Sequence, residues 1–292
     1  MVEKAERQAA GVLRTLIALV VLFLFWGAVV YTFWPEWMPH LLGVVQSVRG
    51  IGAESFESTY FDVRNSSGAS AAQVREAVRL LETDYQAILE FLQLAPGDPI
   101  SVLITDGYGP ALAEGYRLNL FYGNGVLDLD TAPFFLAFLS QGRPFDLKVD
   151  LFVEAGFALY VCEEIGRAEP LIGQPADAWV SLLLAHDALL PLAEARQLDV
   201  PQNEQDLFDA VRALVESGSF VRWLIEKQGM GVVQELRAGL SVETVTDQSL
   251  AEAEEAWLAS VMEKELEPQP CSRALTPGSL LGDFCKQLEK EH

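Results

Sequence analysis

The chain has 292 residues, of which 50% are hydrophobic and 21% charged, and its formal net charge at pH 7 is −22. This composition excludes an intrinsically disordered chain, and the length is enough for one sizeable globular domain or two small ones. The charge argues against nucleic acid as a partner, because phosphate binding needs clustered basic residues and those present here are few and scattered.

Residues 15–34 (TLIALVVLFLFWGAVVYTFW) contain no charge and have the length that a helix needs to cross the hydrocarbon layer. We interpret this run as an uncleaved single-pass transmembrane anchor, which makes the lipid bilayer a partner. A cleavable signal peptide is the alternative. Its apolar core would be shorter and would end in small residues, whereas this run is followed by Pro35 and Glu36.

Three basic residues precede the run, and the first one after it is Arg49. The positive-inside rule therefore keeps residues 1–14 in the cytoplasm. Residues 35–54 become a membrane-proximal segment, and the bulk of the chain lies outside, in the periplasm or the extracellular space. The expected location is the cytoplasmic (inner) membrane.

Strand and helix patterns alternate after the anchor. Residues 55–63 (SFESTYFDV) have the composition of one strand, residues 71–94 have helical spacing, and residues 99–105 (PISVLIT) indicate a buried strand. In LNLFYGNGVLDLD, two alternating runs flank Asn124 and Gly125, the dipeptide that favours a type I′ hairpin.

Helical spacing dominates the rest of the chain. The predicted helices cover residues 131–141, 147–165, 176–196, 204–227, 232–240 and 250–264. The expected fold class is therefore α+β, with a small lobe of strands and a hairpin followed by a mostly helical lobe. We expect one extracytoplasmic domain over residues 55–266 and a Pro- and Gly-containing tail over residues 267–292.

The sequence contains three cysteines. Cys162 falls in an apolar helix, where a free thiol behaves as a small hydrophobic residue. Cys271 and Cys285 lie in the tail, and an outward compartment permits a disulfide between them, worth about 3 kcal/mol in the chain-entropy model.

Glu154 lies within the apolar stretch LFVEAGFALYVC. This stretch, the later segments SGSFVRWLIEKQG and LAEAEEAWLASV, and the order of strands and helices resemble gluzincin-type metallopeptidase domains of bacterial exported proteins. The resemblance runs from residue 55 to residue 261 and implies a thermolysin-like architecture. In that family a glutamate at the position of Glu154 is the third zinc ligand, and Gly156, Ala158 and Tyr160 match the residues that follow it.

The resemblance also implies an HExxH motif on the preceding helix, with two histidines to bind zinc and a glutamate to activate its water. The best-aligned pentad, residues 133–137 (PFFLA), offers none of these groups. Phe134, Phe135 and Phe138 indicate instead that packing fills the cleft. We therefore predict no metal, no cofactor and no catalytic residue, with Glu154 as a relic of the ligand position.

No other residues restore the missing site. The histidines are His40, His186 and His292, too far apart for a paired motif, and His186 is expected to be a hydrogen-bonded core residue rather than a ligand. Asp128 and Asp130 could do acid–base work as a pair, but we favour a solvated strand face.

Two roles remain open for Glu154. As a structural relic it would favour the positive end of its helix and pair with Arg143 or Lys148. As a retained functional group it would bind a ligand or a basic side chain of a partner. In either case a buried Glu154 requires a charge partner.

Two functions follow from these observations. The first is a non-catalytic, membrane-anchored pseudopeptidase-like domain that acts by contact with another membrane or envelope protein, as a scaffold or accessory subunit of a complex. The second is an exported hydrolase with a non-standard site around Glu154 and His186. The small number of histidines favours the first.

Overall fold

The computed structural model describes residues 54–108, 111–141, 151–168, 172–197, 204–264, 266 and 288. The anchor predicted at residues 15–34 lies outside these ranges, as do Cys271 and Cys285 of the predicted disulfide. Among the described residues, no helix is long and apolar enough to span a bilayer. Contacts within the chain separate Met1–Ala53 from the unit Glu54–His292, to which all described elements belong.

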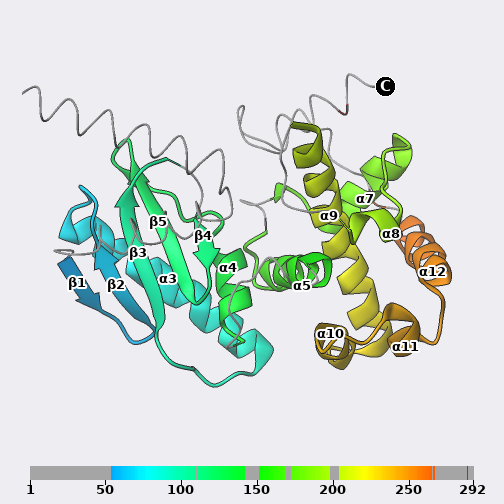
Figure 1. Ribbon diagram of the computed structural model, residues 1–292, viewed down its shortest axis with the longest axis horizontal. Coiled ribbons are helices and arrows are strands. Elements are labelled where there is room, and N and C mark those ends of the chain that lie inside the picture. Colours follow the sequence, from blue (N-terminus) through cyan, green and yellow to red (C-terminus); the bar gives the residue numbers. More distant parts are fainter. Residues whose placement is uncertain are drawn as a thin grey trace, which may run out of the picture. The chain divides into compact units, whose positions relative to one another are not determined.

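One mixed sheet occupies the first half of the described chain (Figure 1). Its strands are β1 (Glu54–Glu57), β2 (Phe61–Asn65), β3 (Ile100–Asp106), β4 (Leu112–Glu114), β5 (Arg117–Gly123) and β6 (Val126–Leu127). The order is β1-β2-β3-β5-β4, and β6 pairs with β5. Strands β2, β3 and β5 are parallel, whereas β1, β4 and β6 are antiparallel to their neighbours. The sequence had not indicated β4.

Helix α3 (Ala71–Leu92) packs against the sheet (Figure 1). Its apolar positions Val74, Leu81 and Ile88 share one core cluster with strand residues, because helical spacing places them on one face. Ser70 and Gln73 form a capping box at its start. The helix ends two residues earlier than predicted, since Gln93 takes a left-handed conformation with φ of 55°.

The prediction of one strand over residues 55–63 was wrong, because this segment turns back as the β1–β2 hairpin. The hydroxyl of Ser58 accepts hydrogen bonds from the backbone N–H groups of Tyr60 and Phe61, both over 3.2 Å. It also donates to Glu82 of α3 over 2.7 Å. A serine hydroxyl that bonds to the local backbone favours a turn over a continuous strand.

The predicted type I′ hairpin is confirmed at Asn124 and Gly125, whose φ angles are 51° and 82°. Strand β6 is only two residues long, however. Asp128 and Asp130 therefore lie beyond the strand and not on its face.

Helices form the second half of the described chain (Figure 1). They are α4 (Ala132–Leu139), α5 (Leu151–Glu164), α7 (Ala176–Ala185), α8 (Leu192–Ala195), α9 (Glu204–Gln228), α10 (Gly231–Arg237), α11 (Val242–Thr246) and α12 (Leu250–Glu263). Helix α9 contacts α5, α7, α8, α10 and α12, so it is the centre of this half. The predicted combination of a strand-containing half and a helical half is confirmed.

The single helix predicted over residues 176–196 was wrong, since the structure has α7 and α8 with a break between them. Asp187 takes a left-handed φ of 47°, and Pro191 occupies the N-cap of α8. A proline has no N–H to continue the helical ladder and restricts the residue before it, so the helix must restart. Helix α11 was also missed, although Ser241 caps it by accepting from Thr244 N.

Candidate functional site

Glu154 lies in the first turn of α5 and forms an ion pair with Arg237 in the last turn of α10. The guanidinium Nε donates to Oε1 of the carboxylate over 2.7 Å. Only 5% of the Arg237 side chain and 6% of the Glu154 side chain are exposed. The prediction that a buried Glu154 requires a partner is confirmed.

The sequence did not predict Arg237 as the partner of Glu154. For the relic role it had named Arg143 or Lys148, and both lie outside the described residues. The Arg237 guanidinium carbon also lies 5.5 Å from the centroid of the Phe157 ring, a cation–π contact. The ion pair joins positions 83 residues apart. The only local signal was an arginine at a helix C-terminus, where the helix dipole favours a cation.

Gly156 allows α5 and α9 to approach closely. A Cβ at this position would lie 2.3 Å from the carbonyl oxygen of Ser217, so the backbone of one helix would have to shift to accept it. On α9, a Cβ at Gly218 would lie 2.6 Å from Cδ2 of Leu159. Gly156 is therefore a packing residue that fixes the helix carrying Glu154.

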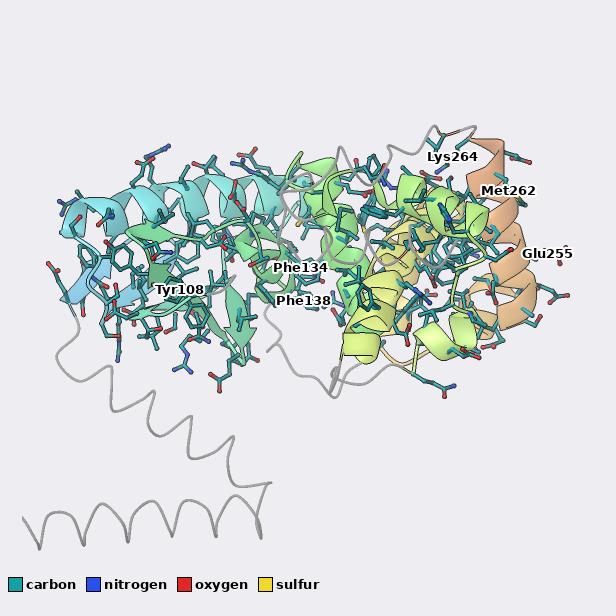
Figure 2. All side chains as sticks on the ribbon, turned by 90° about the horizontal axis from the view of Figure 1, so that it is seen from above. Tyr108, Phe134, Phe138, Glu255, Met262 and Lys264 are labelled. Atoms are coloured by element: carbon teal, nitrogen blue, oxygen red, sulfur yellow. The ribbon has the colours of Figure 1, made fainter. Side chains whose placement is uncertain are left out.

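The pentad at residues 133–137 lies in α4, and its proline, leucine and alanine are buried. Phe134 makes edge contacts with Phe135 and Phe138, with ring centroids 5.4 Å and 5.3 Å apart. All three rings belong to or pack against the hydrophobic core, and Figure 2 marks Phe134 and Phe138 on this helix. The predicted packing role of these aromatic residues is confirmed.

His186 does not lie inside an apolar helix as predicted; it is the half-buried C-cap of α7. Glu154 forms its ion pair with Arg237. Among the described residues, no hydrogen bond or ion pair joins Glu154 to His186. Within the described ranges, no group of three or more His, Cys, Asp or Glu side chains is arranged to hold a metal ion. Cys162 is a buried free thiol, and burial strongly raises its pKa.

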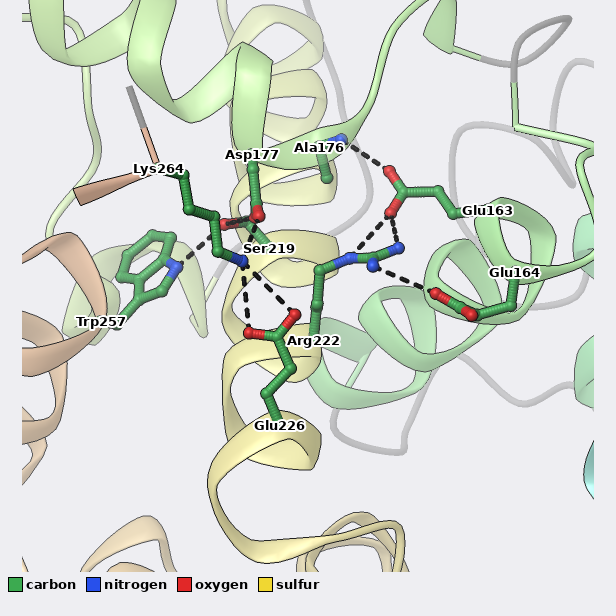
Figure 3. Close-up of polar contacts among 9 residues, drawn as sticks. All are labelled: Glu163, Glu164, Ala176, Asp177, Ser219, Arg222, Glu226, Trp257 and Lys264. Carbon is green, nitrogen blue, oxygen red and sulfur yellow. Dashed lines mark hydrogen bonds and ion pairs between the residues drawn. The ribbon is translucent and has the colours of Figure 1, made fainter. Parts of the chain in front are cut away.

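A polar network near the end of α5 includes Glu163, Arg222 and Glu164 (Figure 3). Oε1 of Glu163 accepts from Ala176 N over 2.6 Å at the start of α7, and Oε2 forms an ion pair with Arg222. Arg222 also pairs with Glu164 over 3.1 Å, and its guanidinium carbon lies 5.3 Å from the Tyr160 ring centroid. Burial raises the pKa of Glu163 more than the Arg222 charge lowers it.

A second branch of the network connects α7, α9 and α12 (Figure 3). Asp177 accepts from Ser219 Oγ over 2.6 Å and from Lys264 Nζ over 2.7 Å. Ser219 in turn accepts from the buried Trp257 Nε1 over 2.9 Å. Lys264 also pairs with Glu226 over 3.2 Å. Since every carboxylate drawn in Figure 3 has a partner, the network orients helices and is structural.

Glu216 on α9 is a fully buried carboxyl group. Its Oε1 accepts from Leu190 N over 2.9 Å, and its Oε2 has no hydrogen-bond partner among the described residues. Burial raises the pKa of Glu216 to about 8, because the nearby N–H and Arg212 only partly offset the desolvation of the charged form. Through its bond to Leu190 N, the Glu216 carboxyl group fixes the backbone between α7 and α8 to α9.

None of the compared family models, curated proteins or solved structures matches the chain. The contacts of the site itself therefore define its chemistry. Its central carboxylate is bound by an arginine, the helix before it carries packing residues, and the neighbouring carboxylates hold helices together.

Proposed function

We propose that this chain is a non-catalytic, membrane-anchored domain of gluzincin-like, thermolysin-like architecture that acts by protein contact. It serves as a scaffold or accessory subunit of a membrane or cell-envelope complex. Residues 15–34 cross the bilayer once, with residues 1–14 in the cytoplasm and the folded domain outside. Its partner is another membrane or envelope protein.

The buried ion pair between Glu154 and Arg237 carries the proposal. A carboxylate that ligates a catalytic zinc directs an oxygen at the metal, beside two further protein ligands. Here Oε1 of Glu154 accepts from Arg237, whose positive charge compensates the carboxylate. The packed aromatic side chains of α4 support the same conclusion, since residues 133–137 provide neither ligand nor base.

Zinc content and proteolysis test the non-catalytic part of the proposal. We would purify the full-length chain in detergent without added metal, measure zinc by mass spectrometry and assay cleavage of unfolded casein. We expect substoichiometric zinc and no cleavage. Stoichiometric zinc, together with chelator-sensitive cleavage that Glu154→Gln abolishes, would overturn it and favour the hydrolase.

Topology and partner capture test the rest of the proposal. A reporter that works only outside the cytoplasm should be active when it is fused after His292. Activity of a reporter that works only in the cytoplasm would contradict the proposed orientation. Crosslinking in source-cell membranes, followed by affinity capture of the full chain, should enrich a membrane or envelope protein relative to capture of residues 1–54 alone. Equal recovery with both would count against contact through the folded domain.

A further inference from the structure

A cleft of about 560 Å³ opens where β3, β5 and β6 end. Leu80, Phe121, Leu127 and Leu129 contribute apolar side chains to its lining. Tyr108, Asn124, Asp128 and Asp130 contribute the polar ones. Among the described residues that line it, none is a lysine or an arginine. The cleft therefore combines an apolar surface with an aromatic ring and two acids.

The Tyr108 ring is held in position although 78% of the residue is exposed (Figure 2). Its hydroxyl donates to Oδ1 of Asn124 over 3.0 Å. A Cβ at Gly123 would lie 2.5 Å from the carbonyl oxygen of Gly107 and 2.6 Å from Cδ1 of Tyr108. Only a glycine leaves room for the ring against the strand, so the local backbone presents an aromatic face at the cleft.

Asp128 and Asp130 lack positive partners in the described part of the chain. Within the described ranges, Oδ1 of Asp128 accepts one hydrogen bond, from the backbone N–H of Asp130 over 3.1 Å. Burial and the charge of Asp128 both raise the pKa of Asp130. Two carboxylates that repel each other in a cleft are stabilised when a cation binds between them or beside them.

We propose that this cleft binds an arginine side chain from a basic segment of a partner protein. The planar guanidinium stacks on the Tyr108 ring and pairs with Asp128 and Asp130, while its methylene groups contact Leu127 and Leu129. Charge complementarity selects this occupant, because the described lining of the cleft has two acids and no basic residue, and the whole chain carries a net charge of −22. A negative chain also speeds encounter with a basic segment.

The cleft shares no residue with the Glu154–Arg237 pair. The inference thus goes beyond the proposed function, and neither depends on the other. A chain that proved to be a peptidase could still bind arginine at this cleft, and a scaffold could bind its partner elsewhere.

The test is a fluorescence-anisotropy titration of the full-length chain with a labelled glycine–serine peptide that carries two arginines. A matched peptide carries citrulline, which keeps the shape of arginine and removes its charge. The cleft variants are Asp128→Asn/Asp130→Asn and Tyr108→Ala. Their matched controls are Glu255→Gln/Glu263→Gln, which removes two exposed acids from α12, and Tyr116→Ala, which removes another exposed ring.

We expect saturable binding of the arginine peptide that weakens at least about tenfold with citrulline or in the double aspartate variant. Tyr108→Ala should weaken binding by about threefold or more, and both controls should stay within about twofold of the original chain. We expect each variant to stay folded, because all the substituted residues are exposed, and thermal unfolding midpoints will check this.

Three results would overturn the inference. The first is no saturable binding of the arginine peptide, including the case in which calcium alone binds and is lost in the aspartate variant. The second is an equal loss in the α12 control, which would show attraction to overall charge only. The third is unchanged affinity in Tyr108→Ala, which would show that the Tyr108 ring does not contribute to binding.

Discussion

Arg237 donates to Glu154 over 2.7 Å and thereby joins the last turn of α10 to the first turn of α5. Both side chains are at least nine-tenths buried. The charge of the buried carboxylate is therefore balanced within the chain. The contribution of this ion pair to the stability of the fold can be measured.

Arg237→Met should destabilise the fold by about 3 to 5 kcal/mol, because it removes the buried cation that pairs with the buried Glu154 carboxylate. Glu154→Leu/Arg237→Met should recover most of that loss, since an apolar pair carries no desolvation cost for ions. The measurement is the free energy of unfolding in urea, followed by tryptophan fluorescence. Arg79→Met is the control, because its ion pair with Glu76 is exposed, and its midpoint should not change. A double variant as unstable as Arg237→Met would contradict this account.

Gly156→Ala should destabilise the fold by at least about 1 to 3 kcal/mol, because the added Cβ would overlap the Ser217 carbonyl at 2.3 Å. The same urea experiment measures the loss. Gly231→Ala is the matched control, since nothing lies within 4 Å of a Cβ built there. It should leave stability unchanged or raise it slightly, because alanine favours a helix. Equal stability of the two variants would show that α5 and α9 separate without cost.

Stability should fall as the pH rises toward and through about 8, the raised pKa of Glu216. Below the unfolded pKa near 4.5 the group is protonated in both states and its contribution is fully present. Between these values the folded state binds one more proton than the unfolded state, so stability falls by up to about 1.4 kcal/mol per pH unit.

Glu216→Gln tests this assignment because the amide stays neutral at every pH and keeps an acceptor for Leu190 N. Unfolding free energies measured on both sides of the raised pKa should show a shallower pH dependence in the variant. The same slope in both proteins would assign the pH dependence to other groups.

Native alkylation without reductant should leave all three cysteines unmodified. Cys162 is protected because burial removes access and raises its pKa, so little thiolate forms. Denaturation without reductant should expose one thiol, and denaturation with reductant should expose three. Intact mass counts the additions. If Cys271 and Cys285 react before reduction, the predicted disulfide does not form.

Short-range patterns in the sequence determined much of the secondary structure. The spacing of apolar residues predicted α3, α5, α9 and α12, since one buried face repeats every three or four residues. The Asn124–Gly125 dipeptide predicted its hairpin, because both residues must take positive φ. Residue identities alone also showed that the HExxH motif is absent, and they predicted that a buried Glu154 needs a charge partner.

Tertiary structure decided what depends on distant groups. The turn at Ser58 gains its bond to Glu82 only when the sheet packs on α3, and the order of the strands depends on pairing that no local pattern records. Arg237 meets Glu154 because α10 returns to α5 after α9 has crossed it at Gly156. Sequence periodicity reports which face of an element is buried, but the identity of the group against that face is fixed only when the chain folds.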